Sequence, residues 1–461
     1  MRAEAAVMRS RDALAMAGLV HRKRTIILGA AGRDFHDFNM LFRADPSTRV
    51  VAFTAAQIPG IADRRYPPAL SGPLYPLGIA IEDEVDLETI CRRDDIEQVV
   101  FAYSDVTHDT VMHLASRALS TGADFLLPGP RRTMLHSILT VIAVSAVRTG
   151  CGKSQVARWL SHRLCRRGIK VAVLRHPMPY GDLEQQRVQR FATRADLDVA
   201  SCTIEEREEY EPHIAAGNVV FAGVDYATIL AAAEKEACVI LWEGGNNDFP
   251  FVRPNLHLVL VDALRPDQLT THHPGETVLR MADVIVVNKV DAAPAEDVAR
   301  LADAAAAINP KATIVRAASP VRLDDPTAIQ GRAVLVVEDG PTITHGGMSY
   351  GAGYAAATAV AGVRVIDPRE SAAPEIAAIY DAYPHIGRVL PATGYAPAQR
   401  AALAQTINGS AAEIVVSATT ADIAAVLDIE KPVVRARYGF EEVEEPGLGA
   451  IIDTFLDRRG I

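Results

Sequence analysis

One stretch of the chain constrains its fold more than any other. The apolar run TVIAVSAV is followed by RTGCGKSQ and then by the helical pattern VARWLSHRLCRRG. A bound phosphate chain needs backbone N–H groups at a helix N-terminus, an ammonium group for its oxygens and a hydroxyl for Mg²⁺. The stretch therefore predicts a nucleotide-binding loop between a buried strand and a helix. The predicted nucleotide-binding residues are Gly150, Cys151, Gly152, Lys153, Ser154 and Gln155.

The loop departs from the common P-loop pattern GxxxxGK[ST], because Val147 stands where the first glycine belongs. It matches the deviant pattern xKGGxGK[ST] better, with Arg148 in the signature lysine position and Thr149 in place of a glycine. The segment thus resembles the deviant P-loop class, in which the signature cation can reach a nucleotide bound across a dimer. This resemblance makes Arg148 and Lys153 candidate catalytic cations.

A second signal is an acid at the end of an apolar strand, in VILWEGGNNDFPF. Ligands of parallel α/β sheets bind beyond the carboxyl ends of the strands, so Glu243 is expected beside the loop. A carboxylate and a hydroxyl suit Mg²⁺, which makes Ser154 and Glu243 the predicted metal ligands. Glu243 resembles a Walker B acid, and its E-G-G context is similar to dethiobiotin synthetase. A solvated turn residue is the alternative.

The run VIVVNKVD ends a further strand with an NKxD motif, formed by Asn288, Lys289 and Asp291. In such a motif the aspartate pairs with the N–H donors of guanine, and the alternative is an ordinary turn. These residues are predicted to bind the nucleotide, which makes GTP a possible nucleotide, although they do not settle the choice of base.

Cations also follow predicted strands. Arg175 and His176 come after VAVL, and Arg265 comes after VLVDAL. The guanidinium group of arginine binds phosphate oxygens through pairs of N–H groups, and histidine can transfer a proton near neutral pH. We expect these three to face a phosphorylated acceptor as catalytic residues, although each alone is more often a surface residue.

Two further segments have open interpretations. The acid-rich CTIEEREEYEPHI is expected to be a solvated helix face, with a metal or lid role for Glu205, Glu206 or Glu209 as the alternative. In EDGPTITHGGMSYGAG, the glycines around His345 and Tyr350 either expose backbone N–H groups to a ligand or form a structural loop.

Short β-rich runs alternate with helical patterns throughout the 461 residues, which predicts an α/β protein with parallel sheets. The predicted fold is a P-loop NTPase sheet with a Rossmann-like α/β domain before it and a small α/β unit after it. The predicted parts are an N-terminal extension at 1–23, the Rossmann-like domain at 24–136, the P-loop domain at 137–325 and the C-terminal domain at 326–461.

The composition excludes several partners. A net charge of −10 provides no global basic field for nucleic acid, and no run of about 18 apolar residues could span a membrane. Five scattered cysteines without CxxC spacing argue against a disulfide framework and against a zinc site. We therefore expect a soluble cytoplasmic protein that binds neither nucleic acid nor membrane.

Five segments together resemble the cyclic 2,3-diphosphoglycerate synthetase family: RTGCGKSQ, CTIEEREEYEPHI, WEGGNNDFPF, RMADVIVVNKVD and EDGPTITHGGMSYGAG. The resemblance covers the chain from about Arg24 to its end. It implies a homodimeric ATP- and Mg²⁺-dependent ligase that closes 2,3-bisphosphoglycerate into a cyclic phosphoanhydride, with release of ADP and phosphate. Lys153 and Ser154 would hold the nucleotide, Glu243 would complete the metal site, and the strand-end cations would face the acceptor.

Two other classes stay open from the sequence. A GTPase of the deviant P-loop class, acting as a metallochaperone or assembly switch, would also combine this loop with NKxD, although the chain lacks CxxC and a His-rich tract. A P-loop amide or carboxylate ligase of the dethiobiotin synthetase kind is the weaker alternative, since it depends mainly on the E-G-G context.

Overall fold

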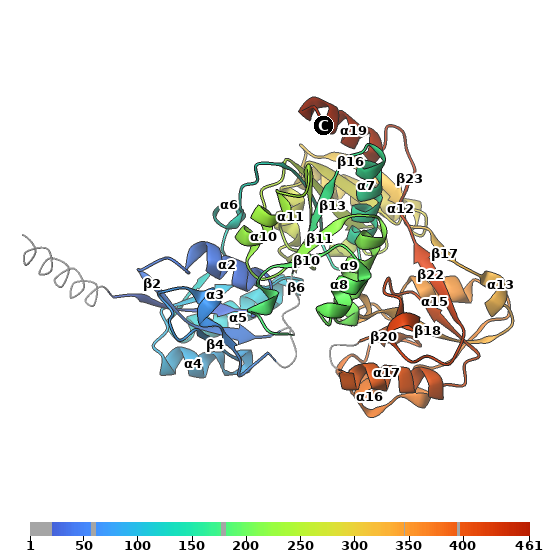
Figure 1. Cartoon of the computed structure of the whole chain (residues 1–461), viewed down its shortest axis with the longest axis horizontal. Coiled ribbons are helices and arrows are strands. Elements are labelled where there is room, and N and C mark those ends of the chain that lie inside the picture. The colour runs from blue at the N-terminus through green and yellow to red at the C-terminus, as the bar shows by residue number, and fades with distance from the viewer. Residues whose placement is uncertain (1–20, 57–60, 177–180, 345, 394–396) are drawn as a thin grey trace, which may run out of the picture. The chain divides into compact units, whose positions relative to one another are not determined.

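A computed structural model describes residues 21–56, 61–176, 181–344, 346–393 and 397–461 (Figure 1). Most of the predicted N-terminal extension, at 1–20, and His345 lie outside the described residues. The chain forms two compact units. The first contains Met1–Tyr103, Asp109–Thr133 and Pro177–Arg187, and the second contains Ser104–His108, Met134–His176 and Val188–Ile461. No helix of the described residues is long and apolar enough to cross a membrane.

The first unit is built on one six-stranded sheet with the order β3-β4-β2-β1-β5-β7, in which only β3 is antiparallel to its neighbour. Its strands are β1 (Lys23–Leu28), β2 (Thr48–Ala55), β3 (Arg65–Tyr66), β4 (Ile79–Asp83), β5 (Gln98–Phe101) and β7 (Asp124–Leu126). Its helices are α2 (Arg33–Leu41), α3 (Pro68–Ser71), α4 (Leu87–Arg93), α5 (His108–Leu119) and α6 (Pro130–Thr133).

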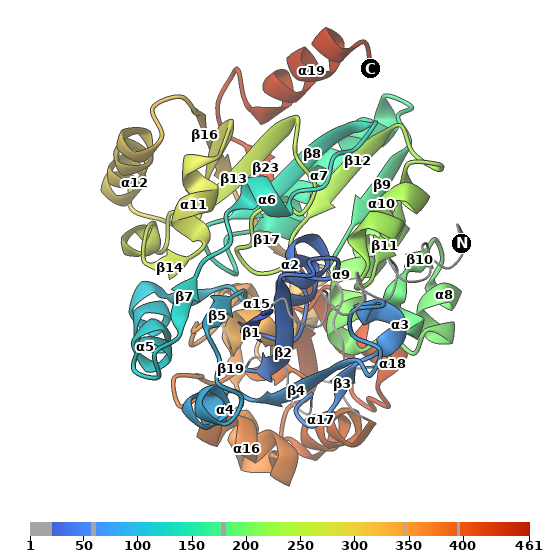
Figure 2. The same cartoon turned by 90° about the vertical axis from the view of Figure 1, so that its left-hand side faces the viewer.

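The second unit contains a nine-stranded sheet with the order β10-β11-β9-β12-β8-β13-β15-β16-β23 (Figure 2). Only the outermost pairs, β10 with β11 and β16 with β23, are antiparallel. The strands are β8 (Thr140–Ala146), β9 (Val171–Leu174), β10 (Gln189–Phe191), β11 (Val219–Ala222), β12 (Val239–Glu243), β13 (Leu256–Asp262), β15 (Val284–Asn288), β16 (Thr313–Ala318) and β23 (Glu441–Glu442). A separate pair joins β6 (Val106–Thr107) to β14 (His272–His273).

Both faces of this sheet are buried, as expected for parallel strands with apolar residues at successive positions. Ile142 and Val144 of β8 belong to one core with α7, whereas Val141 and Ala143 belong to another with α10. The helices of this part are α7 (Lys153–Arg166), α8 (Arg194–Val199), α9 (Ile204–Ala215), α10 (Tyr226–Ala233), α11 (Gly275–Arg280) and α12 (Ala295–Ile308).

A second sheet in this unit is formed by C-terminal residues and has the order β17-β22-β21-β18-β19, with β20 also paired to β18. Its strands are β17 (Val321–Leu323), β18 (Ala333–Asp339), β19 (Arg364–Val365), β20 (Leu390–Ala392), β21 (Ile414–Ser417) and β22 (Val433–Tyr438). Its helices are α13 (Pro326–Ile329), α14 (Gly340–Ile343), α15 (Ala352–Thr358), α16 (Pro374–Ala382), α17 (Pro397–Gly409) and α18 (Ile423–Val426). The mostly parallel strands of both sheets confirm the predicted α/β class.

The end of the chain returns to the nine-stranded sheet. Strand β23 pairs with β16, and helix α19 (Leu448–Arg459) packs its apolar side into the same core as α7. Asp453 of α19 accepts hydrogen bonds from Arg163 of α7 at 2.5 and 3.1 Å. The residues predicted as a C-terminal domain therefore also complete the P-loop part of the second unit.

Candidate functional site

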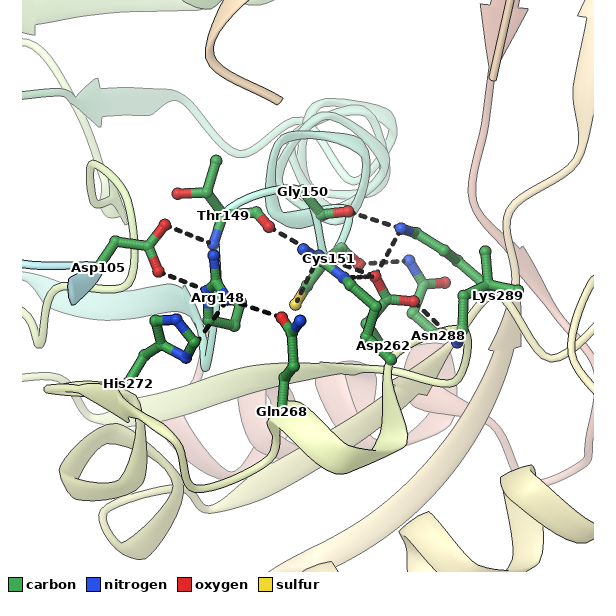
Figure 3. A network of polar contacts seen from close by, with 12 residues as sticks. Asp105, Arg148, Thr149, Gly150, Cys151, Asp262, Gln268, His272, Asn288 and Lys289 are labelled. Carbon is green, nitrogen blue, oxygen red and sulfur yellow. Dashed lines mark hydrogen bonds and ion pairs between the residues drawn. The ribbon is translucent and has the colours of Figure 1, made fainter. Parts of the chain in front are cut away.

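The predicted nucleotide-binding loop joins β8 to α7, and α7 begins at Lys153 (Figure 3). Gly150 and Gly152 have φ angles of +82° and +100°, a conformation that glycine adopts without strain. Lys153 and Ser154 are half-buried. Among the described residues, neither of their side chains has a hydrogen-bond or ion-pair partner. The loop thus presents a free ammonium and a free hydroxyl at a helix N-terminus.

Side chains from neighbouring strands hold the carbonyl groups of this loop (Figure 3). The Asn288 amide donates to the Cys151 carbonyl at 2.8 Å, and the Lys289 ammonium donates to the Gly150 carbonyl at 2.7 Å. Arg265 donates to the Thr149 carbonyl at 2.7 Å. The predicted base-contacting residues Asn288 and Lys289 and the predicted acceptor residue Arg265 are therefore placed against the loop backbone.

Two of these cations share one buried carboxylate. Asp262 ends β13 and lies 2.8 Å from the Lys289 ammonium and 2.9 Å from the Arg265 guanidinium. Burial alone would raise the pKa of Asp262, but Lys289 and Arg265 lower it overall. The positive charges of Lys289 and Arg265 are thus partly neutralised within the protein.

The third residue of the NKxD motif, Asp291, has a different partner. The exposed Asp291 accepts a hydrogen bond from the Ser319 backbone N–H at 2.9 Å. The Ser319 hydroxyl donates to the Gln155 side-chain oxygen at 2.8 Å. The structure therefore brings Asp291, Ser319 and Gln155 together next to α7, where a nucleotide base could meet them.

Arg148, the predicted signature cation, is buried in a polar network (Figure 3). Its guanidinium donates to Asp105 and to the Gln268 side chain, both at 2.7 Å. The second Asp105 oxygen accepts the Thr149 backbone N–H at 3.3 Å, and His272 lies 3.3 Å from the same guanidinium. In this conformation Arg148 fixes the start of the loop through contacts within its own chain.

Glu243, at the end of β12, forms a fully buried ionic cluster. Its carboxylate lies 2.7 Å from the Arg175 guanidinium and 2.8 Å from the His213 ring. Although burial alone would raise it, the pKa of Glu243 lies well below its usual range because of Arg175, His213 and Lys153. Arg175 also pairs with Glu209 of α9. The sequence did not single out His213, since nothing marks one histidine of α9 as facing a strand end.

This cluster extends to the loop lysine and to the predicted His176. Burial lowers the pKa of Lys153, and nearby Arg175 lowers it further, against the effect of Glu243. Burial also lowers the pKa of His176 to about 4, although Glu209 lies 3.7 Å away. His176 is therefore neutral at physiological pH.

The site residues fit a nucleotide better than they fit the whole predicted metal site. The Ser154 hydroxyl is free, but Glu243 is already paired with Arg175 and His213. The described residues contain no group of three His, Cys, Asp or Glu side chains that could hold a metal ion. Ser154 would thus be the protein ligand of a Mg²⁺ bound with the nucleotide, and coordination by Glu243 stays a prediction.

The acid-rich segment is helix α9, and the expectation of a solvated face was wrong. Its acids Glu205, Glu206, Glu208 and Glu211 are all at most 5% exposed. The reason is that α9 packs against both parts of the second unit, reaching Glu243 through His213 and the C-terminal sheet through Glu208. Glu206 caps the helix by accepting the Thr203 backbone N–H at 2.8 Å.

A carboxyl pair that the sequence analysis missed lies where α9 meets the C-terminal sheet. Glu208 is hydrogen-bonded to Asp339, the last residue of β18, and accepts the Thr419 hydroxyl. Burial and the charge of Asp339 raise the pKa of Glu208 well above its usual range. The two acids are 131 positions apart in the chain, and no sequence pattern links them.

The glycine-rich segment after β18 connects this pair to the P-loop. Asp339 accepts the Thr342 backbone N–H at 3.1 Å, and a Cβ added at Gly150 would lie 3.6 Å from the Thr342 methyl carbon. The neighbouring Glu338 accepts backbone N–H groups of Gly351, Gly353 and Tyr354 at 2.7 to 3.3 Å. These backbone N–H groups therefore bind a buried carboxyl group of the same chain. Tyr350 is 50% exposed.

The close approach of Asn288 to the loop leads to a first prediction. In Gly152→Ala the new Cβ would collide with the Asn288 amide, and φ of +100° strains any L-residue. We expect ATP affinity to fall at least tenfold, measured by calorimetric titration. Gly168→Ala is the matched control, because φ there is +76° but nothing lies within 4 Å of the added atom. Equal ATP affinity in both variants would contradict the tight contact.

The buried Glu206 leads to a second prediction. Burial raises its pKa to about 7 from 4.5. Because the folded protein binds this proton more tightly, its contribution to stability is complete below pH 4.5 and is lost as the pH rises through 7. This shift corresponds to roughly 3 kcal/mol. We expect the unfolding temperature to fall less between pH 5 and pH 8 in Glu206→Gln than in the wild type.

The control for this measurement is Glu375→Gln, at an exposed position of α16. It should keep the pH dependence of the wild type. If Glu206→Gln also kept it, Glu206 would be ionised in the folded protein throughout this pH range.

A comparison with protein families supports the P-loop assignment of this fold through residues that follow the loop in the chain. The family model for the P-loop domain of cyclic 2,3-diphosphoglycerate synthetase matches residues 213–318, which include Glu243, Asp262 and the NKxD residues. The fold and the loop are those of a P-loop nucleotide-binding enzyme, and the synthetase domain that matches this chain indicates the ATP-dependent ligase type.

A full-length relative gives the family. The chain is 55% identical over 434 residues to "Arginine synthetase ArcE" from Thermococcus kodakarensis. The aligned residues cover 94% of this chain and 97% of that protein. The protein belongs to the family of this arginine synthetase.

Solved structures resemble it more distantly. LpxK from Aquifex aeolicus, solved in complex with ATP, has a TM-score of 0.43 and 12% identity, covering 70% of this chain and 90% of LpxK. HypB from Helicobacter pylori, solved in complex with nickel, has a TM-score of 0.24 and 12% identity, covering 45% of this chain and 84% of HypB.

Proposed function

We propose that this protein is an arginine synthetase. It would use ATP to convert citrulline, the ureido counterpart of arginine, and ammonia into arginine, ADP and inorganic phosphate. The name of a relative that is 55% identical over nearly the whole chain supports the product. Citrulline and ammonia are suitable precursors of this product for two reasons. The terminal nitrogens of arginine carry no substituent, which fits ammonia, and its guanidinium carbon has the oxidation state of a urea, which fits a ureido substrate.

The proposed reaction uses the γ-phosphoryl group of ATP to activate a poor leaving group. Transfer of this group to the ureido oxygen breaks the bond between the γ-phosphorus and the bridging oxygen, and ADP leaves. Ammonia then attacks the ureido carbon, a C–N bond forms, the C–O bond breaks and the oxygen leaves on inorganic phosphate. One proton of ammonia passes to the released phosphate as the guanidinium product forms. The energy of one ATP phosphoanhydride bond therefore drives the exchange of oxygen for nitrogen.

Each part of the P-loop has a role in this proposal. The Lys153 ammonium, which meets no carboxylate among the described residues, would stabilise the negative charge of the transferred phosphoryl group. Ser154 would hold Mg²⁺, which supplies charge neutralisation for the phosphates. Asn288, Lys289 and Arg265 would keep the loop in its phosphate-binding conformation by holding its carbonyl groups.

The observation that carries the proposal is the charge balance of the site. A bisphosphorylated acceptor needs cations that are free to meet it, but the predicted acceptor cations Arg175 and Arg265 are paired with Glu243 and Asp262. The C-terminal sheet instead supplies the carboxyl group of Asp339, beside the segment that approaches the P-loop. Carboxylates suit an ammonium ion and a guanidinium product, and they would repel a polyanion.

Cyclisation of 2,3-bisphosphoglycerate is the second candidate. The match of residues 213–318 to the P-loop domain of the synthetase for that reaction favours it. For this reaction Arg175, His176 and Arg265 would need to leave their present contacts and face the acceptor. The GTPase switch predicted from NKxD is the third candidate, and its turnover would not depend on either acceptor.

One set of rate measurements separates these candidates. Purified protein with Mg²⁺ is given ATP or GTP, alone, with citrulline and ammonium, or with 2,3-bisphosphoglycerate, and nucleotide hydrolysis and products are followed together. We expect ADP release with ATP to require both citrulline and ammonium and to match the arginine formed. ADP release that requires only 2,3-bisphosphoglycerate, or GTP turnover without any acceptor, would overturn the proposal.

A further inference from the structure

A cavity of about 320 Å³ lies between α7, α8, α9 and β22 of the second unit, apart from the nucleotide-binding loop. Four arginines line it, namely Arg158, Arg194, Arg435 and Arg437, together with the single acid Glu211. Its volume falls within the range of small-molecule sites. In a chain with a net charge of −10, this concentration of positive charge is unexpected unless an anion binds there.

Arg158 is the side chain that most requires a ligand. It is half-buried on α7, and among the described residues its guanidinium has no hydrogen-bond or ion-pair partner. Burial lowers its pKa, which is the direction expected for a cation removed from water without a counter-ion. Taking a charged group out of water without a partner is unfavourable. A bound anion would offset this cost.

The other guanidinium groups are held at the cavity by weaker or local contacts. Arg194 lies 3.9 Å from Glu211, and Arg435 donates to the Thr420 carbonyl at 2.8 Å and to the Ala421 carbonyl at 3.4 Å and lies 3.8 Å from the Asp422 carboxylate. Arg437 is already paired with Asp324 at 2.6 Å and adds little free charge. Arg158 and Arg194 therefore keep most of their donors for a ligand and Arg435 keeps some of its own, and arginine binds oxyanions through pairs of N–H groups.

We infer that this cavity binds a small oxyanion, the carboxylate or phosphate group of a metabolite, at a site separate from the P-loop. None of the residues 150–155 or 288–291 lines the cavity. Arg158 lies five residues after Lys153 along α7, which corresponds to roughly 7.5 Å. The inference does not depend on the reaction proposed above.

The test is calorimetric titration of Lys153→Ala, which removes the main phosphate-binding cation of the P-loop. The probes are inorganic phosphate and, separately, malonate. We expect at least one of them to bind once per chain. Adding Arg158→Met should raise its Kd at least tenfold. Adding Arg280→Met should leave the Kd within twofold, because Arg280 is an exposed arginine of α11 that pairs with Glu276.

The pattern of binding also identifies the ligand. Binding of phosphate alone would indicate a phosphate ester, and binding of malonate alone would indicate a carboxylate, and both results support the site. Should Arg158→Met fail to fold by circular dichroism, Arg435→Met provides the same comparison. If neither anion binds at millimolar concentration, or if the Kd is the same with and without Arg158, the inference is wrong.

Discussion

Replacing Lys153 by alanine is expected to reduce ATP-dependent product formation by about a hundred- to a thousandfold, the usual cost of removing one group that stabilises transition-state charge. The ammonium stands at the N-terminus of α7 and, among the described residues, has no partner that would compete with a phosphate. Steady-state rates with saturating ATP measure the effect on turnover.

The matched control is Lys311→Ala, which removes an exposed lysine before β16 in the same unit. It should leave the rate within twofold of the wild type, and the unfolding temperature of both variants should stay close to that of the wild type. A Lys153→Ala protein that keeps a tenth of its activity would show that the phosphoryl group is transferred elsewhere.

Replacing Glu243 by leucine is expected to have the largest effect on stability. It leaves the buried Arg175 and His213 without their shared carboxylate, and breaking a buried ion pair costs about 3–5 kcal/mol. For a unit of this size the unfolding temperature should fall by roughly 10 °C. Thermal denaturation followed by circular dichroism measures this change.

A double variant separates stability from activity. In Glu243→Leu with Arg175→Met the unpaired cation is removed together with its partner, so most of the lost stability should return. Activity should stay low, because the double variant lacks both the predicted metal ligand Glu243 and the predicted catalytic cation Arg175 at the strand ends near Lys153. If Glu243→Leu were as stable as the wild type, the cluster would not be an ion pair in solution.

The local parts of the site could be predicted from the sequence. Strand β8, the loop and helix α7 are contiguous, and the glycines, the lysine and the serine follow from the needs of a phosphate chain. The position of Glu243 is predictable as well, since a short apolar run that ends in an acid indicates both a buried strand and the residue at its carboxyl end. The α/β class follows from the same alternation of runs.

The contacts of the strand-end residues could not be predicted in this way. Arg175 was expected to face an acceptor, but its partners Glu209 and Glu243 lie 34 and 68 positions away, and only the sheet order brings them together. The pair of Glu208 and Asp339 forms between helix α9 and strand β18, which are likewise far apart in the chain. The burial of helix α9 could not be predicted, because acids on several sides of a helix are typical of a solvated helix. Only the two sheets that pack against α9 show that these acids are buried.

In the proposed reaction, the γ-phosphoryl group of ATP passes to the ureido oxygen of citrulline. Citrulline labelled with ¹⁸O in its ureido group is incubated with the protein, ATP, Mg²⁺ and ammonium, and the inorganic phosphate formed is analysed by ³¹P NMR or mass spectrometry. We predict one ¹⁸O atom in each phosphate released and an equal amount of unlabelled arginine. Phosphate without ¹⁸O, formed while ATP is consumed, would contradict the proposed reaction.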